Sequence, residues 1–194
     1  QVLLDGKRLR GGDPAAAISA GIGFCTEDRK KEGLALKLSI LLNMTLVRLP
    51  LLSKFGVINR QKQRAAADEY MQSISIKAPS VSQLVGNLSG GNQQKVVVAK
   101  WLMMHPKVLI VDEPTRGIDV GSKSEIYGLL SDLAKQGMAI IVVSSEIEEI
   151  MGVCDSVVTI SEGKKTAQLR ITPELTREQV LSCALGSKPD WADN

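Results

Sequence analysis

Two short apolar runs on either side of an amphipathic helix constrain the fold of this chain more than any other feature. Residues 108–111 and 139–143 are continuous apolar runs, as expected of parallel strands that are covered on both faces. Residues 124–136 are predicted to be a helix from apolar side chains at helical spacing, namely Ile126, Leu129, Leu130 and Leu133. This order of strand, helix and strand predicts an α/β fold with a parallel sheet.

The run 108–111 ends abruptly in two carboxylates, Asp112 and Glu113. A carboxylate at the end of a buried strand can hold Mg²⁺, directly or through water, and its neighbour is suited to polarise an attacking water. On its own, the string Asp-Glu-Pro-Thr is as readily a turn that ends the strand. The motifs around it therefore decide which interpretation holds.

A hydroxyl and two glycines precede the predicted helix over residues 91–104. Ser89 can cap this helix, which is the ordinary role of a serine at such a position. The same geometry points the unhindered amides of Gly90 and Gly91, and the positive end of the helix dipole, at a phosphate group. Both roles can hold at once. Because only 23 positions separate Ser89 from Asp112, we interpret the two motifs together as nucleotide chemistry.

Composition narrows the classes of function. The chain has 194 residues, 44% hydrophobic and 23% charged, as is typical of a globular protein with one sizeable core. The net charge of +3 is too small to argue for nucleic acid, and 3% aromatic residues make a poor platform for stacking bases. A single histidine excludes zinc sites that need several imidazoles, and three cysteines without a C-x-x-C pair fit a reducing cytosol. No apolar run approaches the ~18–20 residues of a membrane span.

A charged loop and a helical stretch lie upstream of these motifs. The apolar run at residues 22–25 leads directly into a charged loop at 26–33, the pattern of a sheet edge that carries a site. Helices are predicted over 40–47 and 60–74, and no strand is expected between residues 34 and about 85. We interpret this stretch as a mainly helical insertion.

The C-terminal part predicts a hairpin and a final helix. Residues 156–160 and 165–169 read as two antiparallel strands, Thr176 and Gln179 form a capping box, and the tail from residue 186 is expected to fray. The chain is expected to comprise four segments: 1–33, part of an α/β core; 34–95, the helical subdomain; 96–170, the rest of the core; and 171–194, a C-terminal helix and tail.

The motifs together resemble those of the ABC-type ATPases. Over about residues 1–186 the chain is similar to the second nucleotide-binding half of bacterial ABC importers for simple sugars of the ribose, galactose, arabinose and xylose type. The resemblance rests on four strings: LSGGNQQK at 88–95, TEDRK at 26–30, DEPTRGIDVG at 112–121 and SSE at 144–146. It implies a partial RecA-like P-loop NTPase core with a helical subdomain inserted in it.

The resemblance also implies roles for individual residues. Ser89, Gly90 and Gly91 would contact the γ-phosphate of an ATP held by the opposite half, with Asn92 and Gln93 belonging to the same nucleotide-binding motif. Asp112 would be the Mg²⁺ ligand and Glu113 would occupy the position of the catalytic base. Asp119 would lie in the loop that crosses between the two halves.

Two positions depart from the pattern of most ABC ATPases. Glu27 stands where most have a glutamine that links the metal site to the membrane partner. Ser145, at the second catalytic position, stands where most have a histidine that holds the γ-phosphate and the water. A serine cannot reproduce that contact, which suggests a weak site in this half. Ser145 could equally be a cap for a helix that starts at Glu146.

No G-x-x-x-x-G-K-[ST] phosphate loop occurs in the sequence. The pairs Gly6-Lys7 and Gly163-Lys164 lack both the upstream glycine and the following hydroxyl. The resemblance places the family's phosphate loop upstream of residue 1, so the chain is expected to be a fragment. We therefore expect the isolated chain to bind ATP poorly and to be inactive.

In the complete protein, the resemblance implies Mg²⁺-dependent ATP hydrolysis that drives import of a monosaccharide. The expected partners are a first ATPase half, membrane permease subunits and, indirectly, a periplasmic sugar-binding protein, with no nucleic acid. The expected location is peripheral, on the cytoplasmic face of the inner membrane. Two alternatives remain open: a soluble ABC ATPase that acts on nucleic acid or the ribosome, and a non-catalytic interaction module without a phosphate loop.

Overall fold

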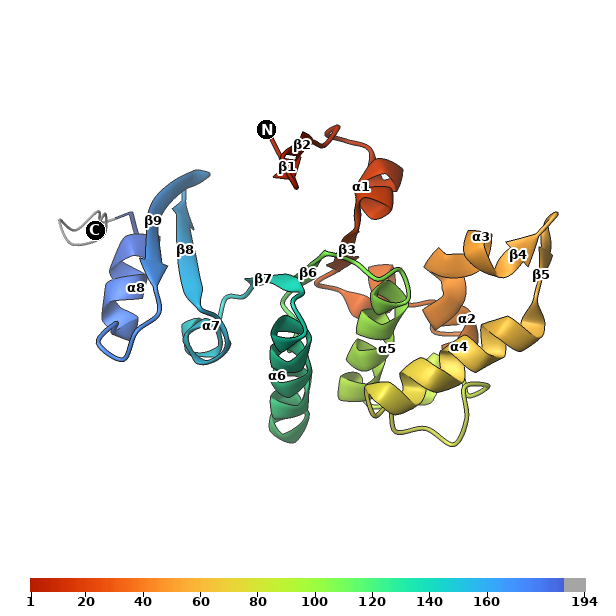
Figure 1. The fold of residues 1–194 in the computed structure, drawn as a ribbon. Coiled ribbons are helices and arrows are strands. Elements are labelled where there is room, and N and C mark those ends of the chain that lie inside the picture. Colours follow the sequence, from red (N-terminus) through yellow and green to blue (C-terminus); the bar gives the residue numbers. More distant parts are fainter. Residues whose placement is uncertain (187–194) are drawn as a thin grey trace. The chain divides into compact units, whose positions relative to one another are not determined.

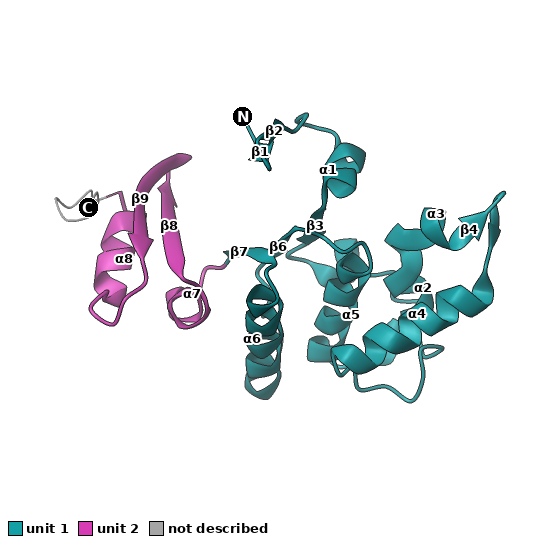
Figure 2. Ribbon diagram, viewed as in Figure 1, with its two compact units in different colours: residues 1–143 teal, residues 144–194 magenta. Residues whose placement is uncertain are grey.

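The computed structural model describes residues 1–186 and divides the chain into two compact units, residues 1–143 and 144–194 (Figures 1 and 2). The first unit contains the parallel sheet and the helical stretch, and the second contains a hairpin and two helices. Each unit buries its own cluster of apolar side chains. The predicted division into four segments stays a prediction.

The sheet of the first unit is parallel, as predicted. It consists of β3 (Ile22–Cys25), β6 (Val108–Asp112) and β7 (Ala139–Val143), in the order β3-β6-β7. Cys25 pairs with Val111, and Asp112 pairs with Val143. Since neighbouring parallel strands point the same way, the residues that follow all three strands lie at one edge of the sheet.

Helices α5 (Gly90–Leu102) and α6 (Val120–Lys135) pack into the same core as the strands. Leu109, Val111 and Ile126 are fully buried there. On the other face of the sheet, Phe24, Ile141 and Val143 keep 42%, 51% and 48% of their surface exposed in the structure of residues 1–186. The prediction that β6 and β7 are buried on both faces is therefore correct for one face only.

The stretch between residues 29 and 87 is largely helical, but it is not free of strands. It holds a π-helix (Arg29–Gly33), α2 (Ile40–Thr45), a 3₁₀ turn (Leu46–Arg48), α3 (Leu49–Leu52), α4 (Arg60–Ser73) and a second 3₁₀ turn (Val85–Asn87). A small hairpin, β4 (Ser53–Lys54) with β5 (Val57–Ile58), contradicts the expectation of no strand. Its turn residues Phe55 and Gly56 have φ values of +51° and +78°, as a tight two-residue hairpin loop requires.

The first residues form a short hairpin and a helix. Strand β1 (Leu3–Leu4) pairs with β2 (Lys7–Arg8), and α1 (Pro14–Ala20) follows. Asp13 caps α1 by accepting from the amide of Ala16 at 3.0 Å. The helix ends at Gly21, whose φ of +100° is readily adopted only by glycine.

The second unit consists of α7 (Ile147–Val153), β8 (Ser156–Ser161), β9 (Lys164–Arg170) and α8 (Arg177–Ala184). The antiparallel hairpin and the capping box of Thr176 and Gln179 are confirmed. The predicted frayed tail lies, after Gly186, outside the described residues. Within residues 1–186, no helix is both long and apolar enough to cross a membrane.

Two of the three cysteines lie in the interior. Cys25 and Cys183 are buried, Cys154 is half-buried, and all three are free thiols. Burial raises the pKa of the Cys25 thiol to about 12, against a smaller opposing effect of Lys100. A thiol with so high a pKa is inert at neutral pH and serves as a small apolar side chain.

Candidate functional site

Asp112 and Glu113 lie at the carboxyl edge of the sheet. Asp112 is the last residue of β6, and the amide of Glu113 donates to the carbonyl oxygen of Val143 at 2.8 Å. Glu113 has a φ of +45°, which is uncommon for a residue with a side chain and costs about 1–3 kcal/mol. The backbone thus turns sharply at Glu113, directly after β6, as the sequence predicts for a strand that ends abruptly in two carboxylates.

The charged loop after β3 is joined to the loop after β6 by two arginines. Glu27 forms an ion pair with Arg116. Arg29 is 7% exposed, and its guanidinium donates to the carbonyl oxygens of Arg116 at 2.5 Å and Gly117 at 3.0 Å. Burial lowers the pKa of Arg29, and Asp28 opposes this shift. The candidate residue Glu27 is therefore linked directly to the loop that follows Asp112 and Glu113.

The burial of Arg29 could not be read from the sequence. Arg29 is one of three consecutive basic residues, and Lys30 and Lys31 stay exposed. Only Arg29 has acceptors in the protein interior, and those carbonyls lie 87 and 88 positions away in the chain. A planar fork of donors suits this bidentate contact, which a lysine could not make.

The start of α5 is pressed against the same loop. A Cβ on Gly90 would lie 2.9 Å from Nη2 of Arg29 and 3.1 Å from the carbonyl oxygen of Gly117. A Cβ on Gly91 would lie 2.6 Å from Cβ of Ser122. The two glycines thus permit a close approach of α5 to the segment 117–122, in addition to any approach to a phosphate.

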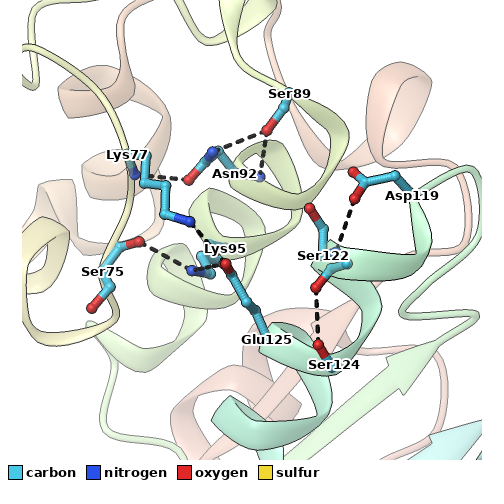
Figure 3. Close-up of polar contacts among 10 residues, drawn as sticks. Ser75, Lys77, Ser89, Asn92, Lys95, Asp119, Ser122, Ser124 and Glu125 are labelled. Carbon is cyan, nitrogen blue, oxygen red and sulfur yellow. Dashed lines mark hydrogen bonds and ion pairs between the residues drawn. The ribbon is translucent and has the colours of Figure 1, made fainter.

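Polar contacts surround Ser89 at this helix start (Figure 3). Ser89 caps α5 by accepting from the amide of Asn92 at 3.5 Å, and its hydroxyl also accepts from Asn92 Nδ2 at 2.9 Å. Asp119 caps α6 and accepts from the amide of Ser122 at 2.9 Å, and this contact lowers the pKa of the carboxyl. The caps of two helices, both predicted as site residues, are thus drawn in one view, and Ser122 lies close to Gly91 in the first turn of α5.

Gln93 lies in the interior instead. Its side chain is 4% exposed, and Nε2 donates to the carbonyl oxygen of Val85 at 3.3 Å. The neighbouring Gln94 is 2% exposed. Of the motif at 88–95, the structure thus places Ser89 at the surface and both glutamines inside.

Ser145 belongs to the second unit. Helix α7 begins at Ile147, and its N-cap residue is Glu146. The hydroxyl that contacts this helix start is that of Ser144, which accepts from the amide of Glu146 at 3.0 Å. The interpretation of Ser145 as the helix cap is therefore wrong, because the helix starts one residue later than predicted.

The donor set fits Mg²⁺ bound together with a nucleotide. Among residues 1–186, no group of three or more His, Cys, Asp and Glu side chains could hold a metal ion. Asp112 and Glu113 stand at the edge of the sheet. Mg²⁺ is commonly bound by one or two carboxylates, with phosphate oxygens and waters completing its octahedron, rather than by an all-protein cage. Asp112 is thus suited to a metal that arrives with phosphates.

Comparison with protein families and curated proteins agrees with this geometry. Residues 1–116 match the family model described as ABC transporter. The chain is 46% identical over 187 residues to the xylose import ATP-binding protein XylG of Geobacillus kaustophilus, covering 96% of this chain and 37% of that protein. It is also 46% identical over 187 residues to the ribose import ATP-binding protein RbsA of Lactococcus lactis subsp. cremoris, covering 96% and 38%. The chain spans little more than a third of the length of these relatives.

Solved structures share the fold. The cbiO1 protein of Clostridium perfringens, part of the ABC transporter complex cbiONQ, superposes with a TM-score of 0.73 at 25% identity, covering 92% of this chain and 69% of that one. The ATP-binding cassette MJ0796, solved as a dimer bound to ADP and Pi, gives a TM-score of 0.71 at 22% identity, covering 87% and 72%. The predicted α/β ABC ATPase fold is thereby confirmed.

Proposed function

Since this chain belongs to the ABC transporter family, we propose that it is an ATP-binding and ATP-hydrolysing part of a system that imports a monosaccharide through a membrane permease. One observation carries the proposal: the Ser89-Gly90-Gly91 helix start packs closely against Arg29 and Gly117, and Arg29 is itself hydrogen-bonded to the loop that follows Asp112 and Glu113. The similarity to sugar import proteins over 96% of the chain supports the transport role over action on nucleic acid or the ribosome.

We further propose that the chain is the second of two nucleotide-binding halves. Two facts support this assignment: the chain spans 37% of a relative such as XylG, and its sequence contains no G-x-x-x-x-G-K-[ST] string. The cradle for the phosphates would then come from sequence outside this chain. The four-segment division, with a core at 1–33 and 96–170, is part of the same proposal.

In this proposal the two motifs serve different ATP molecules. Ser89, Gly90 and Gly91, with Asn92 beside them, face the ATP of the partner half, where backbone amides and a hydroxyl at a helix start suit a γ-phosphate. Asp112 would hold the Mg²⁺ that accompanies a nucleotide, and Glu113 would orient the attacking water. Asp119 fixes the loop between them by capping α6.

The site served by Glu113 is proposed to be the weaker of the two. Ser145 occupies the position at which most relatives in the wider family have a histidine, and a serine hydroxyl carries no charge to stabilise a transition state. Hydrolysis would then proceed mainly at the site to which Ser89 contributes. The permease, the binding protein and the location on the cytoplasmic face of the inner membrane belong to the same proposal.

The helical stretch offers a surface for the permease. A groove there is lined by Leu42, Val57, Ile58, Arg60 and Arg64, among others, and Val57 is 72% exposed. Residues 34–67 contain no Asp or Glu but six basic residues: Lys37, Arg48, Lys54, Arg60, Lys62 and Arg64. Two of these, Arg60 and Arg64, line the groove, and Arg64 also pairs with Asp68. An apolar groove flanked by arginines fits an amphipathic helix that carries acidic residues. We propose such a cytoplasmic segment of the permease as its occupant, with Glu27 and the exposed residues of the loop 27–32 contributing to the coupling.

Nucleotide titration tests the proposal. Mg-ATP is titrated into this chain alone, and into this chain mixed with a first half of a XylG relative that carries a phosphate loop. We expect weak binding alone, and ATP hydrolysis above that of the first half alone in the mixture. Tight Mg-ATP binding by the isolated chain would contradict the second-half assignment, and an unchanged rate in the mixture would contradict the ATPase role.

A further inference from the structure

The hydroxyl of Ser89 is held in one orientation by a single neighbouring residue. Its oxygen accepts from Asn92 Nδ2 at 2.9 Å and, more weakly, from the Asn92 amide at 3.5 Å. A serine hydroxyl has two lone pairs and one proton to donate. Both acceptor positions are thus occupied by Asn92, and within residues 1–186 no acceptor is recorded for the hydroxyl proton. Ser89 is exposed, so this proton is available to a ligand.

The side-chain amide of Asn92 is itself fixed from the other side. Asn92 Oδ1 accepts from the backbone amide of Lys77 at 2.7 Å. Because the Lys77 amide can only donate, it identifies the oxygen of Asn92 and leaves the NH₂ group facing Ser89. The backbone N–H of Lys77 therefore sets the direction of both hydrogen bonds, from Lys77 to Asn92 and from Asn92 to Ser89.

Glu125 of α6 anchors this arrangement, as Figure 3 shows. Its two carboxylate oxygens pair with Lys77 Nζ and Lys95 Nζ, each at 2.8 Å, and Lys95 also donates to the carbonyl oxygen of Ser75 at 3.0 Å. The Lys95 side chain is only 6% exposed, so its charge depends on this partner. Glu125 thus ties residues 75–77 to α5 and α6 together.

We propose that Asn92 and Glu125 are positioning residues, which make Ser89 a hydrogen-bond donor toward the γ-phosphate of the partner half's ATP. Asn92 acts through Ser89, by occupying both of its acceptor positions. Glu125 acts through Lys77, by holding the backbone amide that orients Asn92. The inference rests on the proposed function, in which Ser89 faces that phosphate.

An isosteric change separates this role from simple packing. In Asn92→Asp, a carboxylate oxygen replaces the NH₂ group and accepts the Ser89 proton, so Ser89 can no longer donate to phosphate. A carboxylate in the first turn of a helix is favourable, so the helix should remain folded. Asn92→Ala is the matched variant, because it removes the amide but leaves the Ser89 proton free.

The measurement is the Kd for pairing of this chain with the phosphate-loop-bearing first half of a XylG relative, in Mg-ATP and in Mg-ADP. Loss of a hydrogen bond to a charged group corresponds to about tenfold in Kd. We expect Ser89→Ala and Asn92→Asp to raise the Kd in ATP about tenfold and Asn92→Ala about threefold, with the Kd in ADP unchanged for all three. In the Ser89→Ala background, Asn92→Asp should add less than about twofold.

Glu125→Gln should weaken pairing in ATP about threefold, since it loosens Asn92 without removing it. Asp132→Asn, an exposed acid on the same helix, is the control and should change nothing. If Glu125→Gln lowers the amount of folded chain, Glu125→Asp restores the charge and should recover most of the affinity.

The outcomes are distinguishable. If the wild-type chain shows no ATP-dependent pairing, the proposed function fails and this assignment fails with it. If the wild type pairs but Asn92→Asp lowers affinity equally in ADP, or equally in the Ser89→Ala background, the effect is general destabilisation or charge repulsion and only the positioning role is overturned. A tenfold loss confined to ATP and abolished by Ser89→Ala supports it.

Discussion

Gly91 lies so close to Ser122 that α5 has no room for a side chain at this position. A Cβ there would be 2.6 Å from Cβ of Ser122, a separation that real side chains do not tolerate. The second glycine of the motif therefore serves the packing of α5 on α6 as well as any nucleotide. The need for glycine at position 91 can therefore be measured as a change in the free energy of unfolding, without ATP.

Gly91→Ala should lower the free energy of unfolding by about 1–3 kcal/mol, because the added methyl group forces α5 and α6 apart. Gly128→Ala is the control: Gly128 lies in α6 with nothing within 4 Å of a Cβ, so alanine there should raise stability by up to about 1 kcal/mol. Urea unfolding followed by circular dichroism gives both values. Ser122→Gly in the Gly91→Ala background should recover part of the loss; no recovery would show that the contact with Ser122 is not the cause.

Arg29→Met should cost about 3 kcal/mol, since it leaves the carbonyls of Arg116 and Gly117 without their buried donors. Arg29→Lys should recover less than half of this loss, because an ammonium cannot make the bidentate contact. Lys30→Met, next to it but exposed, should change stability by less than about 0.5 kcal/mol. Equal effects of the changes at 29 and 30 in urea unfolding would contradict the buried role of Arg29.

The ion pairs of Glu125 predict a dependence of stability on pH. Hydrogen bonds and charge attraction from Lys77 and Lys95 lower the pKa of Glu125 to about 2, from an ordinary value of 4.5. Because the pKa of Glu125 is lower in the folded chain than in the unfolded chain, the unfolded chain takes up the proton first as the pH falls. The ion pairs therefore stabilise the fold fully when the pH is well above 4.5, and this stabilisation is lost as the pH falls from 4.5 toward 2. The difference in unfolding free energy between wild type and Glu125→Gln should therefore be constant from pH 7 to about 5.5 and shrink below that. A difference that grows on acidification would contradict the prediction.

Glu113→Gln should have a small effect on total ATP hydrolysis in the mixture with a first half. A general base contributes about 10²–10⁴-fold at the site it serves, but the proposal gives Glu113 the weaker site, so the total rate should fall by less than half. Ser145→His should raise the rate, and this gain should be lost again in the double variant with Glu113→Gln. Glu69→Gln, on the exposed side of α4, is the control. Loss of nearly all hydrolysis in Glu113→Gln would show that this site is the strong one.

Features determined by a few neighbouring residues could be predicted from the sequence. The strands β6 and β7 and the capping box at Thr176 follow from short strings, and the structure confirms them. The boundaries were less secure: the predicted helix over 40–47 is α2 followed by a 3₁₀ turn from Leu46. The hairpin at 53–58 was missed, because strands of two residues carry no alternation to detect.

Features determined by distant contacts could not be predicted. Arg29 is the buried residue among three consecutive basic residues because it donates to the carbonyls of Arg116 and Gly117, more than 80 positions away in the sequence. The inward position of Gln93 depends on Val85, and the link from Ser89 to Glu125 joins three segments of the chain. The candidate residues can be identified from their sequence motifs, whereas the contacts that hold their side chains can be identified only from the structure.

The shared contacts of Arg29 have a mechanical consequence. The Arg29 guanidinium holds the carbonyls of Arg116 and Gly117, so the loop after β3 cannot slide past the loop after β6 without breaking these two hydrogen bonds. A side chain at Gly90 would have no room beside this guanidinium, so the start of α5 packs against the same point. The exposed ion pair of Glu27 with Arg116 joins the same two loops a second time. A displacement of the loop after β3 is therefore expected to reach the loop after β6 through hydrogen bonds, and the tip of α5 through packing alone.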